Sequence, residues 1–115
     1  MIIDDNKSIT NSLEKYLKLK SHNVSVCNEG HEGLTLIQNK NWDKILLDLS
    51  MPEFSGLDII AILERDNIMK DKNIIIFTAA SISDYIMNKL SAKEGIHGLL
   101  KKPLSIKHLG EALTS

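Results

Sequence analysis

The chain of 115 residues is poor in the features that mark several specialised protein classes. Its one cysteine, Cys27, cannot form a disulfide within the chain, which excludes a disulfide scaffold and fits a reducing cytoplasm. No apolar stretch is long enough to cross a membrane and no secretory signal is recognised, so we expect a cytoplasmic protein without a membrane partner. Cys27 ends the segment 24–27 and is expected to be a small, buried strand residue.

An excess of one charge is also missing, since 14 basic residues stand against 15 acidic ones. Non-specific nucleic-acid binding depends on a basic field, so we expect no direct nucleic-acid partner. The content of 43% apolar and 25% charged residues is ordinary for a globular protein. We therefore expect residues 1–115 to form a single domain, either free-standing or excised from a longer chain.

Short apolar runs alternate with segments of helical periodicity along the chain. Strands are predicted at residues 1–4, 24–27, 44–47, 73–77 and 99–101. Helices are predicted at residues 7–20, 30–40, 56–66 and 105–112, with a further helix capped by Ser83 and Asp84 and ended by Gly95. This alternation predicts an α/β fold of the doubly wound type, a five-stranded parallel sheet with helices on both faces.

Two of the predicted helices carry more specific expectations. The helix over residues 56–66 should present Leu57, Ile60, Ala61 and Leu63 to the sheet, by their spacing. Gly33 lies inside the helix over residues 30–40 and should weaken that helix by about 1 kcal/mol. Asn6 is expected to cap the first helix.

Polar residues that could take part in binding or catalysis stand where four of the predicted strands end. They are Asp4-Asp5, Asp48, Thr78 and Lys102-Pro103. Because ligands of parallel α/β sheets bind at the carboxyl ends of the strands, these residues should converge in one crevice. Three carboxylates in one crevice predict a divalent cation.

Each of these residues also has a purely structural interpretation. Asp4 and Asp5 could simply begin a helix, where carboxylates favour the positive end of the dipole. Thr78 could be an ordinary strand-end residue, and Lys102 a solvated lysine like its neighbour Lys101. Side-chain alternation along a strand sends Lys101 to the face opposite Lys102, so we expect Lys101 to face solvent.

The remaining candidates for chemistry are the histidines and the tryptophan. The histidines, His22, His31, His97 and His108, show no repeated ligand spacing and have no cysteine pair beside them, so all four are expected at the surface or in loops. Trp42 precedes a predicted strand at the end away from the crevice and is expected to pack.

The motifs together resemble the receiver domain of two-component response regulators. The residues that carry the resemblance are Asp4-Asp5, Asp48 with Leu49-Ser50-Met51-Pro52 and Gly56, Phe77-Thr78-Ala79, and Lys102-Pro103. They stand in the family's order over nearly the whole chain. The resemblance implies a flavodoxin-like sheet with strand order 2-1-3-4-5.

Membership would give the crevice a defined chemistry, phosphorylation of an aspartate in the presence of Mg²⁺. Asp48 would be the phosphoacceptor, with the Lys102 ammonium and the Thr78 hydroxyl contacting phosphoryl oxygens. Carried over from the family positions, Asp5 and Asp48 would ligate Mg²⁺ directly. Asp4 would contact the ion through a water molecule or lie just outside the direct ligands. The backbone carbonyl of Ser50 would be the remaining ligand from the protein.

The same resemblance implies a signalling switch that catalyses only its own phosphorylation and dephosphorylation, and is otherwise not an enzyme. The phosphoryl donor would be a histidine kinase or a histidine phosphotransfer protein. A downstream protein would dock on the helix that begins near Asp84, the strand over residues 99–101 and the helix over residues 105–112. The domain would be a monomer or a phosphorylation-dependent dimer.

Three features depart from the family pattern. Leu99 stands where the family usually has an aromatic residue that turns inward on activation. The stretch between Thr78 and Gly95 is longer than in chemotaxis-type receivers. Ser50 occupies a variable position that influences how water reaches the acyl phosphate, so the lifetime of the phosphorylated state stays open.

Two rival functions are compatible with parts of the pattern. A haloacid-dehalogenase-like phosphohydrolase would need a second acid two residues after its nucleophile, and that position here is Ser50. A pseudo-receiver would keep the fold as a protein-interaction module without phosphorylation. Labelling with a small phosphodonor separates the two from a phosphorylated receiver.

Overall fold

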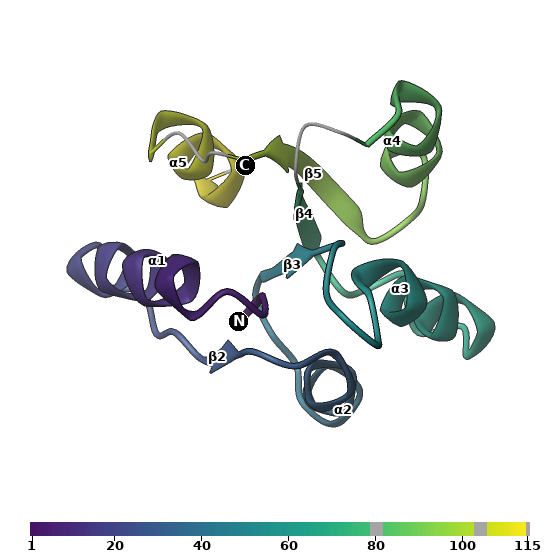
Figure 1. Ribbon diagram of the computed structural model, residues 1–115, viewed down its shortest axis with the longest axis horizontal. Helices are drawn as coiled ribbons and strands as arrows, with labels where there is room; N and C mark the ends of the chain where they lie inside the picture. Colours follow the sequence, from purple (N-terminus) through teal and green to yellow (C-terminus); the bar gives the residue numbers. More distant parts are fainter. Residues whose placement is uncertain (79–81, 103–105, 115) are drawn as a thin grey trace.

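The computed structural model describes residues 1–78, 82–102 and 106–114, and in this part of the chain five parallel strands form one sheet (Figure 1). The strands are β1 (Ile2–Ile3), β2 (Val26–Cys27), β3 (Ile45–Asp48), β4 (Ile74–Thr78) and β5 (Ile96–Lys101). The helices are α1 (Lys7–Leu19), α2 (Gly30–Asn39), α3 (Gly56–Arg65), α4 (Asp84–Ser91) and α5 (Ile106–Thr114). The order β2-β1-β3-β4-β5 confirms the predicted flavodoxin-like topology.

The two faces of the sheet carry separate hydrophobic cores. Helices α2, α3 and α4 cover one face of the sheet, and α1 and α5 cover the other (Figure 1). Ile3 and Leu47 belong to the core on the first face, whereas Ile2, Leu46 and Phe77 belong to the core on the second. Strands β3 and β4 are buried along their whole length, as is usual where helices cover both faces of a parallel sheet. The burial of Cys27 in β2 is also as predicted. Among the described residues, no helix has the length and apolar character to span a membrane.

Strand register brings the predicted site residues to one edge of the sheet. Asp48 pairs with Phe77, and Thr78 pairs with Lys101. Asp4 follows β1 directly and its backbone N–H still donates to the carbonyl of Cys27, 3.1 Å away. The carboxyl ends of β1, β3, β4 and β5 therefore lie together, where the site was expected.

Local polar contacts fix where several helices begin. The side chain of Asn6 accepts a hydrogen bond from the N–H of Ile9, and that of Ser83 accepts one from Ile86, so both predicted caps are present. Ser55 and Asp58 form a reciprocal capping box at the start of α3. The start predicted for the last helix, Ser105, lies outside the described residues, as does Pro103.

The predicted sheet-facing side of α3 is wrong in part. Ile59, Ile60 and Leu63 are buried, while Leu57 is 41% exposed and Ala61 is also exposed. The reason lies at the first residue of the helix. A Cβ on Gly56 would collide with the backbone carbonyl of Asp48, so the helix begins in backbone contact with the end of β3, and this contact sets its rotation.

Gly95 does not end α4, which stops earlier, at Ser91. It has a φ of 89° and stands immediately before β5, where its carbonyl accepts a hydrogen bond from Ile74. A side chain there would meet the carbonyl oxygen of Met69. Its role is to turn the chain into the edge strand, which requires the left-handed backbone that glycine tolerates.

Gly33 packs directly against β1, which changes the expectation that it simply weakens α2. A Cβ at this position would lie 2.9 Å from Cγ2 and 3.0 Å from Cδ1 of Ile3, which is fully buried. The glycine therefore permits α2 to approach the sheet closely.

We predict that Gly33→Ala lowers the free energy of unfolding by about 1 kcal/mol. Crowding of the added methyl group against Ile3 should destabilise the protein by about 1–3 kcal/mol. The higher helix propensity of alanine offsets about 1 kcal/mol of this loss. Gly110→Ala in α5 is the matched control, because a Cβ there would meet nothing within 4 Å and should stabilise the protein. Urea unfolding measures both variants. Equal stabilisation by both substitutions would contradict the contact with Ile3.

Candidate functional site

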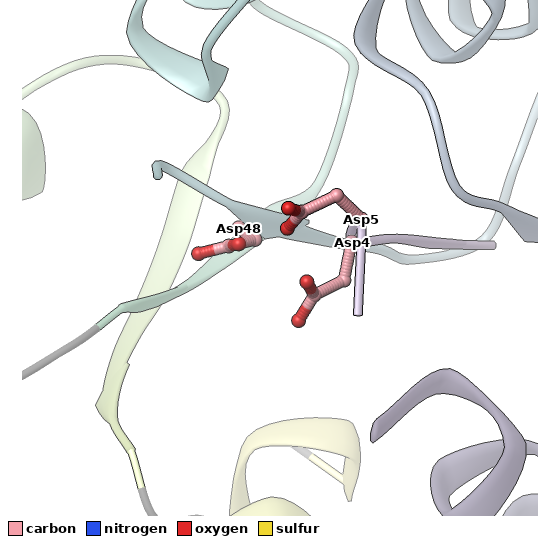
Figure 2. Close-up of side chains that lie close together, drawn as sticks. All are labelled: Asp4, Asp5 and Asp48. Carbon is pink, nitrogen blue, oxygen red and sulfur yellow. The ribbon is translucent and has the colours of Figure 1, made fainter. Parts of the chain in front are cut away.

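Three carboxylates gather at the carboxyl edge of the sheet (Figure 2). Asp4 and Asp5 follow β1, and Asp48 is the last residue of the adjacent strand β3. One oxygen from each carboxylate lies within 4.8 Å of the others. Asp4 and Asp48 are buried whereas Asp5 is exposed, so the cluster opens to solvent on the side of Asp5.

Lys102 is the counter-ion of the two buried acids. Its Nζ lies 2.9 Å from Oδ2 of Asp4 and 3.5 Å from Oδ2 of Asp48. Nζ of Lys102 also lies 4.9 Å from the ring centroid of Phe77, which is a cation–π contact. The ammonium therefore partly neutralises the site across the two strand ends.

Backbone amides hold the remaining oxygens of the same two acids. Oδ1 of Asp4 accepts from the N–H of Asn6 at 2.9 Å, and Oδ1 of Asp48 accepts from the N–H of Ser50 at 3.2 Å. Both are hydrogen bonds of a carboxylate to the amide two residues later, which the tight turns after β1 and β3 make possible. The acids are thus oriented before any ligand arrives.

Burial and mutual repulsion shift the protonation of the cluster. Burial raises the pKa of Asp48 to about 6, an effect that the Ser50 N–H opposes and the charge of Asp4 reinforces. Burial raises the pKa of Asp5 as well, with Asp4 adding to the effect. Negative charge at this edge is therefore costly, and a cation there would relieve the cost.

Thr78 and Lys102 come from β4 and from the end of β5, on the side of β3 away from β1. Thr78 is buried at the end of β4, and its carbonyl accepts a hydrogen bond from the N–H of Lys102 at 2.8 Å. Lys101, opposite Thr78 in the ladder, is exposed as predicted. Residue 79, whose backbone amide follows Thr78, lies outside the described residues.

The histidines and Trp42 take no part in the cluster. His22, His31, His97 and His108 are all exposed, as expected. Trp42 packs against the core and donates through Nε1 to the carbonyl of Leu36, 2.9 Å away. In residues 1–78, 82–102 and 106–114, the one group of three or more potential metal ligands is the aspartate cluster.

The sequence interpretation missed Asn28 and Thr10, which support the cluster from beneath. Nδ2 of Asn28 donates to the carbonyl of Asp4 at 2.7 Å and to the hydroxyl of Thr10 at 3.0 Å. A signal was available, because Asn28 directly follows a predicted strand and so belongs to the same edge of the sheet. Thr10 carried no such signal, since it lies within α1.

The fold is of the flavodoxin-like type, with three aspartates and a lysine gathered at the carboxyl ends of its strands, and comparison with known proteins gives the family. The family model of the response regulator receiver domain matches residues 1–114. The chain therefore belongs to the response regulator receiver family, whose members act as phosphorylation switches in two-component signalling.

Individual relatives agree with this assignment. Response regulator MprA from Mycobacterium sp. (strain KMS) is 30% identical over 110 residues, which make up 95% of this chain and 46% of the relative. A Francisella response regulator receiver domain superposes with a TM-score of 0.83 at 28% identity, covering 98% of this chain and 90% of that one. A Burkholderia pseudomallei response regulator, solved with a phosphorylated aspartic acid and a calcium ion, gives 0.78 at 26% identity, covering 97% and 64%. The chain thus spans about half the length of its curated relative.

We predict that the metal-free protein loses stability as pH rises through about 6. The pKa of Asp48 is higher in the folded state, so its stabilising contribution is complete below about pH 4 and disappears above the folded pKa of about 6. Asp48→Asn should therefore melt at a higher temperature than wild type above pH 7, with a smaller advantage near pH 5. Thermal melting with a chelator measures this, and Asp71→Asn at an exposed site is the control. An advantage independent of pH would contradict the raised pKa.

Proposed function

We propose that Asp48 accepts a phosphoryl group from the phosphohistidine of a kinase or phosphotransfer protein, in the presence of Mg²⁺. The observation that carries the proposal is the convergence of three carboxylates within 4.8 Å, with Lys102 bridging the two buried ones. The Burkholderia relative, solved with a phosphorylated aspartic acid, supports the same chemistry here. We take residues 1–115 as one receiver domain.

The donor set at the edge suits Mg²⁺, which prefers oxygen ligands and retains several waters. Asp5 and Asp48 would bind the ion directly, because Asp5 faces solvent and Asp48 lies beside it. Both oxygens of Asp4 already accept hydrogen bonds, which favours a role through water. The carbonyl of Ser50 would complete the protein ligands. When bound, the ion neutralises the anionic donor so that a carboxylate can approach it.

Phosphoryl transfer requires the carboxylate of Asp48 to attack phosphorus while the bond from phosphorus to the donor imidazole nitrogen breaks. The Lys102 ammonium, already 3.5 Å from Oδ2 of Asp48, would then pair with a phosphoryl oxygen. The Thr78 hydroxyl would donate to a second oxygen. Without a bound cation, the pKa of Asp48, raised by burial to about 6, leaves this carboxylate mostly ionised only above that pH.

The output would be protein docking, carried by α4, β5 and α5. Two large apolar side chains of α4, Tyr85 and Ile86, are 68% and 36% exposed, which suits a protein-binding surface. Leu99 of β5 is half-buried and packs against the core beneath α2, α3 and α4. We propose a cytoplasmic switch, monomeric or dimerising on phosphorylation, that catalyses only its own phosphorylation and dephosphorylation.

We predict that a small labelled phosphodonor labels the wild-type protein with Mg²⁺ but not with chelator, and that Asp48→Ala removes the label. The bond should be sensitive to hydroxylamine, as an acyl phosphate is. Asp71→Ala, at an exposed acid, is the control and should label like wild type. Label that persists in Asp48→Ala would show another acceptor. An unlabelled wild type would indicate a pseudo-receiver, and steady phosphate release without labelled protein would indicate a hydrolase.

Beryllofluoride, which mimics a phosphoryl group on Asp48, should shift amide resonances well beyond the site. A new charge-assisted hydrogen bond from Thr78 is worth about 1.5–3 kcal/mol, enough to move a two-state loop by about tenfold to a hundredfold. Residues 86–99 should therefore respond even though Leu99 is not aromatic. Perturbations confined to Asp5, Asp48, Thr78 and Lys102 would show that the proposed docking surface is wrong. Asp48→Ala with beryllofluoride is the blank.

A further inference from the structure

Asn28 joins the two loops that flank the buried end of β1. It follows β2, and its Nδ2 donates to the carbonyl of Asp4 at 2.7 Å and to Oγ1 of Thr10 at 3.0 Å. Asp4 and Thr10 are both buried, at 0% and 1% exposure, so water does not compete freely for either hydrogen bond. The contact spans 24 residues of sequence and ties the loop after β2 to the loop after β1.

The chemistry of the two partners fixes the orientation of the amide. The carbonyl of Asp4 can only accept, and the Thr10 hydroxyl already gives its hydrogen to the carbonyl of Lys7, 3.2 Å away. Only the NH₂ group of Asn28 can satisfy both, since its Oδ1 has no hydrogen to donate. A carboxylate of the same shape would place acceptor against acceptor at the carbonyl of Asp4, and it could keep its contact with Thr10 only if the Thr10 hydroxyl gave up its hydrogen bond to Lys7.

The carbonyl of Asp4 belongs to the peptide that leads into Asp5. The N–H of Asp4 donates to the carbonyl of Cys27, and β1 itself ends one residue earlier, at Ile3. Because a peptide unit is planar, fixing the carbonyl of Asp4 also fixes the direction in which Asp5 leaves it. The hydrogen bond from Asn28 to this carbonyl therefore orients Asp5, the exposed carboxylate of the cluster.

We propose that Asn28 is a positioning residue for the cation site, setting its affinity through the Asp4–Asp5 peptide with Thr10 as its support. The inference rests on the proposed function, because it takes the aspartate cluster as the site of Mg²⁺. The residue contributes no ligand of its own. Its effect comes from holding the carboxylate of Asp5 in place before the ion binds, as outer partners of metal ligands commonly do.

Asn28→Asp gives the sharpest test, because charge and geometry predict opposite results. The added negative charge alone would tighten Mg²⁺ binding, whereas loss of both donated hydrogen bonds should weaken it by about tenfold. Calorimetric titration with Mg²⁺ measures the affinity, and Asn39→Ala, at an exposed asparagine at the end of α2, should bind like wild type. Affinity that is unchanged or tighter in Asn28→Asp overturns the proposal.

Two further variants distinguish an effect on Mg²⁺ binding from an effect on folding alone. Asn28→Ser keeps one donor and Thr10→Val removes the support, so each should weaken Mg²⁺ binding less than Asn28→Asp does. Titrations are made below the melting transition, which circular dichroism follows for every variant. Lower melting temperatures with wild-type affinity throughout would make Asn28 merely structural and overturn the proposal.

Mg²⁺ titration of an Asp5→Asn variant distinguishes failure of this inference from failure of the proposed function. Weaker binding in Asp5→Asn together with unchanged binding in Asn28→Asp rejects only the role of Asn28. Wild-type affinity in Asp5→Asn rejects the aspartate cluster as the Mg²⁺ site, and the role of Asn28 with it. Weakened binding in both, with Asn39→Ala unchanged, supports both.

Discussion

The ion pair between Lys102 and the buried Asp4 is the interaction on which the site depends. It links residues 98 positions apart, at the ends of β5 and β1, with 2.9 Å between the charged atoms. A buried carboxylate without a partner is strongly destabilising, so Asp4 needs this ammonium as long as no other cation is present. In the proposed reaction Lys102 turns toward a phosphoryl oxygen, so a second cation must take over the neutralisation that Lys102 gives up. On this proposal, cation binding and phosphoryl binding would be coupled through one lysine.

Sequence alone predicts the parts of the fold that depend on burial and on strand ends. Strands β3 and β4 are unbroken apolar runs, and the polar residues Asp48 and Thr78 that end them lie at the common edge, as the parallel arrangement requires. The convergence of Asp4, Asp5 and Asp48 follows from the same rule and is present in the structure. Their roles as ligands and acceptor stay predictions.

The features that sequence did not predict depend on contacts between backbone and side chains distant in the chain. The buried face of α3 begins with Gly56, which lies close against the end of β3, and a pattern of apolar side chains does not mark a glycine as buried. The amide of Asn28 holds a backbone carbonyl, a partner that every residue possesses and no motif marks. The pairing of Lys102 with Asp4 was likewise not anticipated, because the expected partner was a phosphoryl oxygen.

The separation of the two cores has a consequence for how such a domain can diversify. The cores beneath α1 with α5 and beneath α2, α3 and α4 have the sheet between them, so substitutions among the helix side chains of one core do not contact those of the other and should combine almost additively. Each outer surface can then be remodelled for a new partner without repacking the opposite half. The carboxyl edge has no such freedom, because Asp4, Asp48 and Lys102 tie strands from the centre and the margin of the sheet into one electrostatic unit.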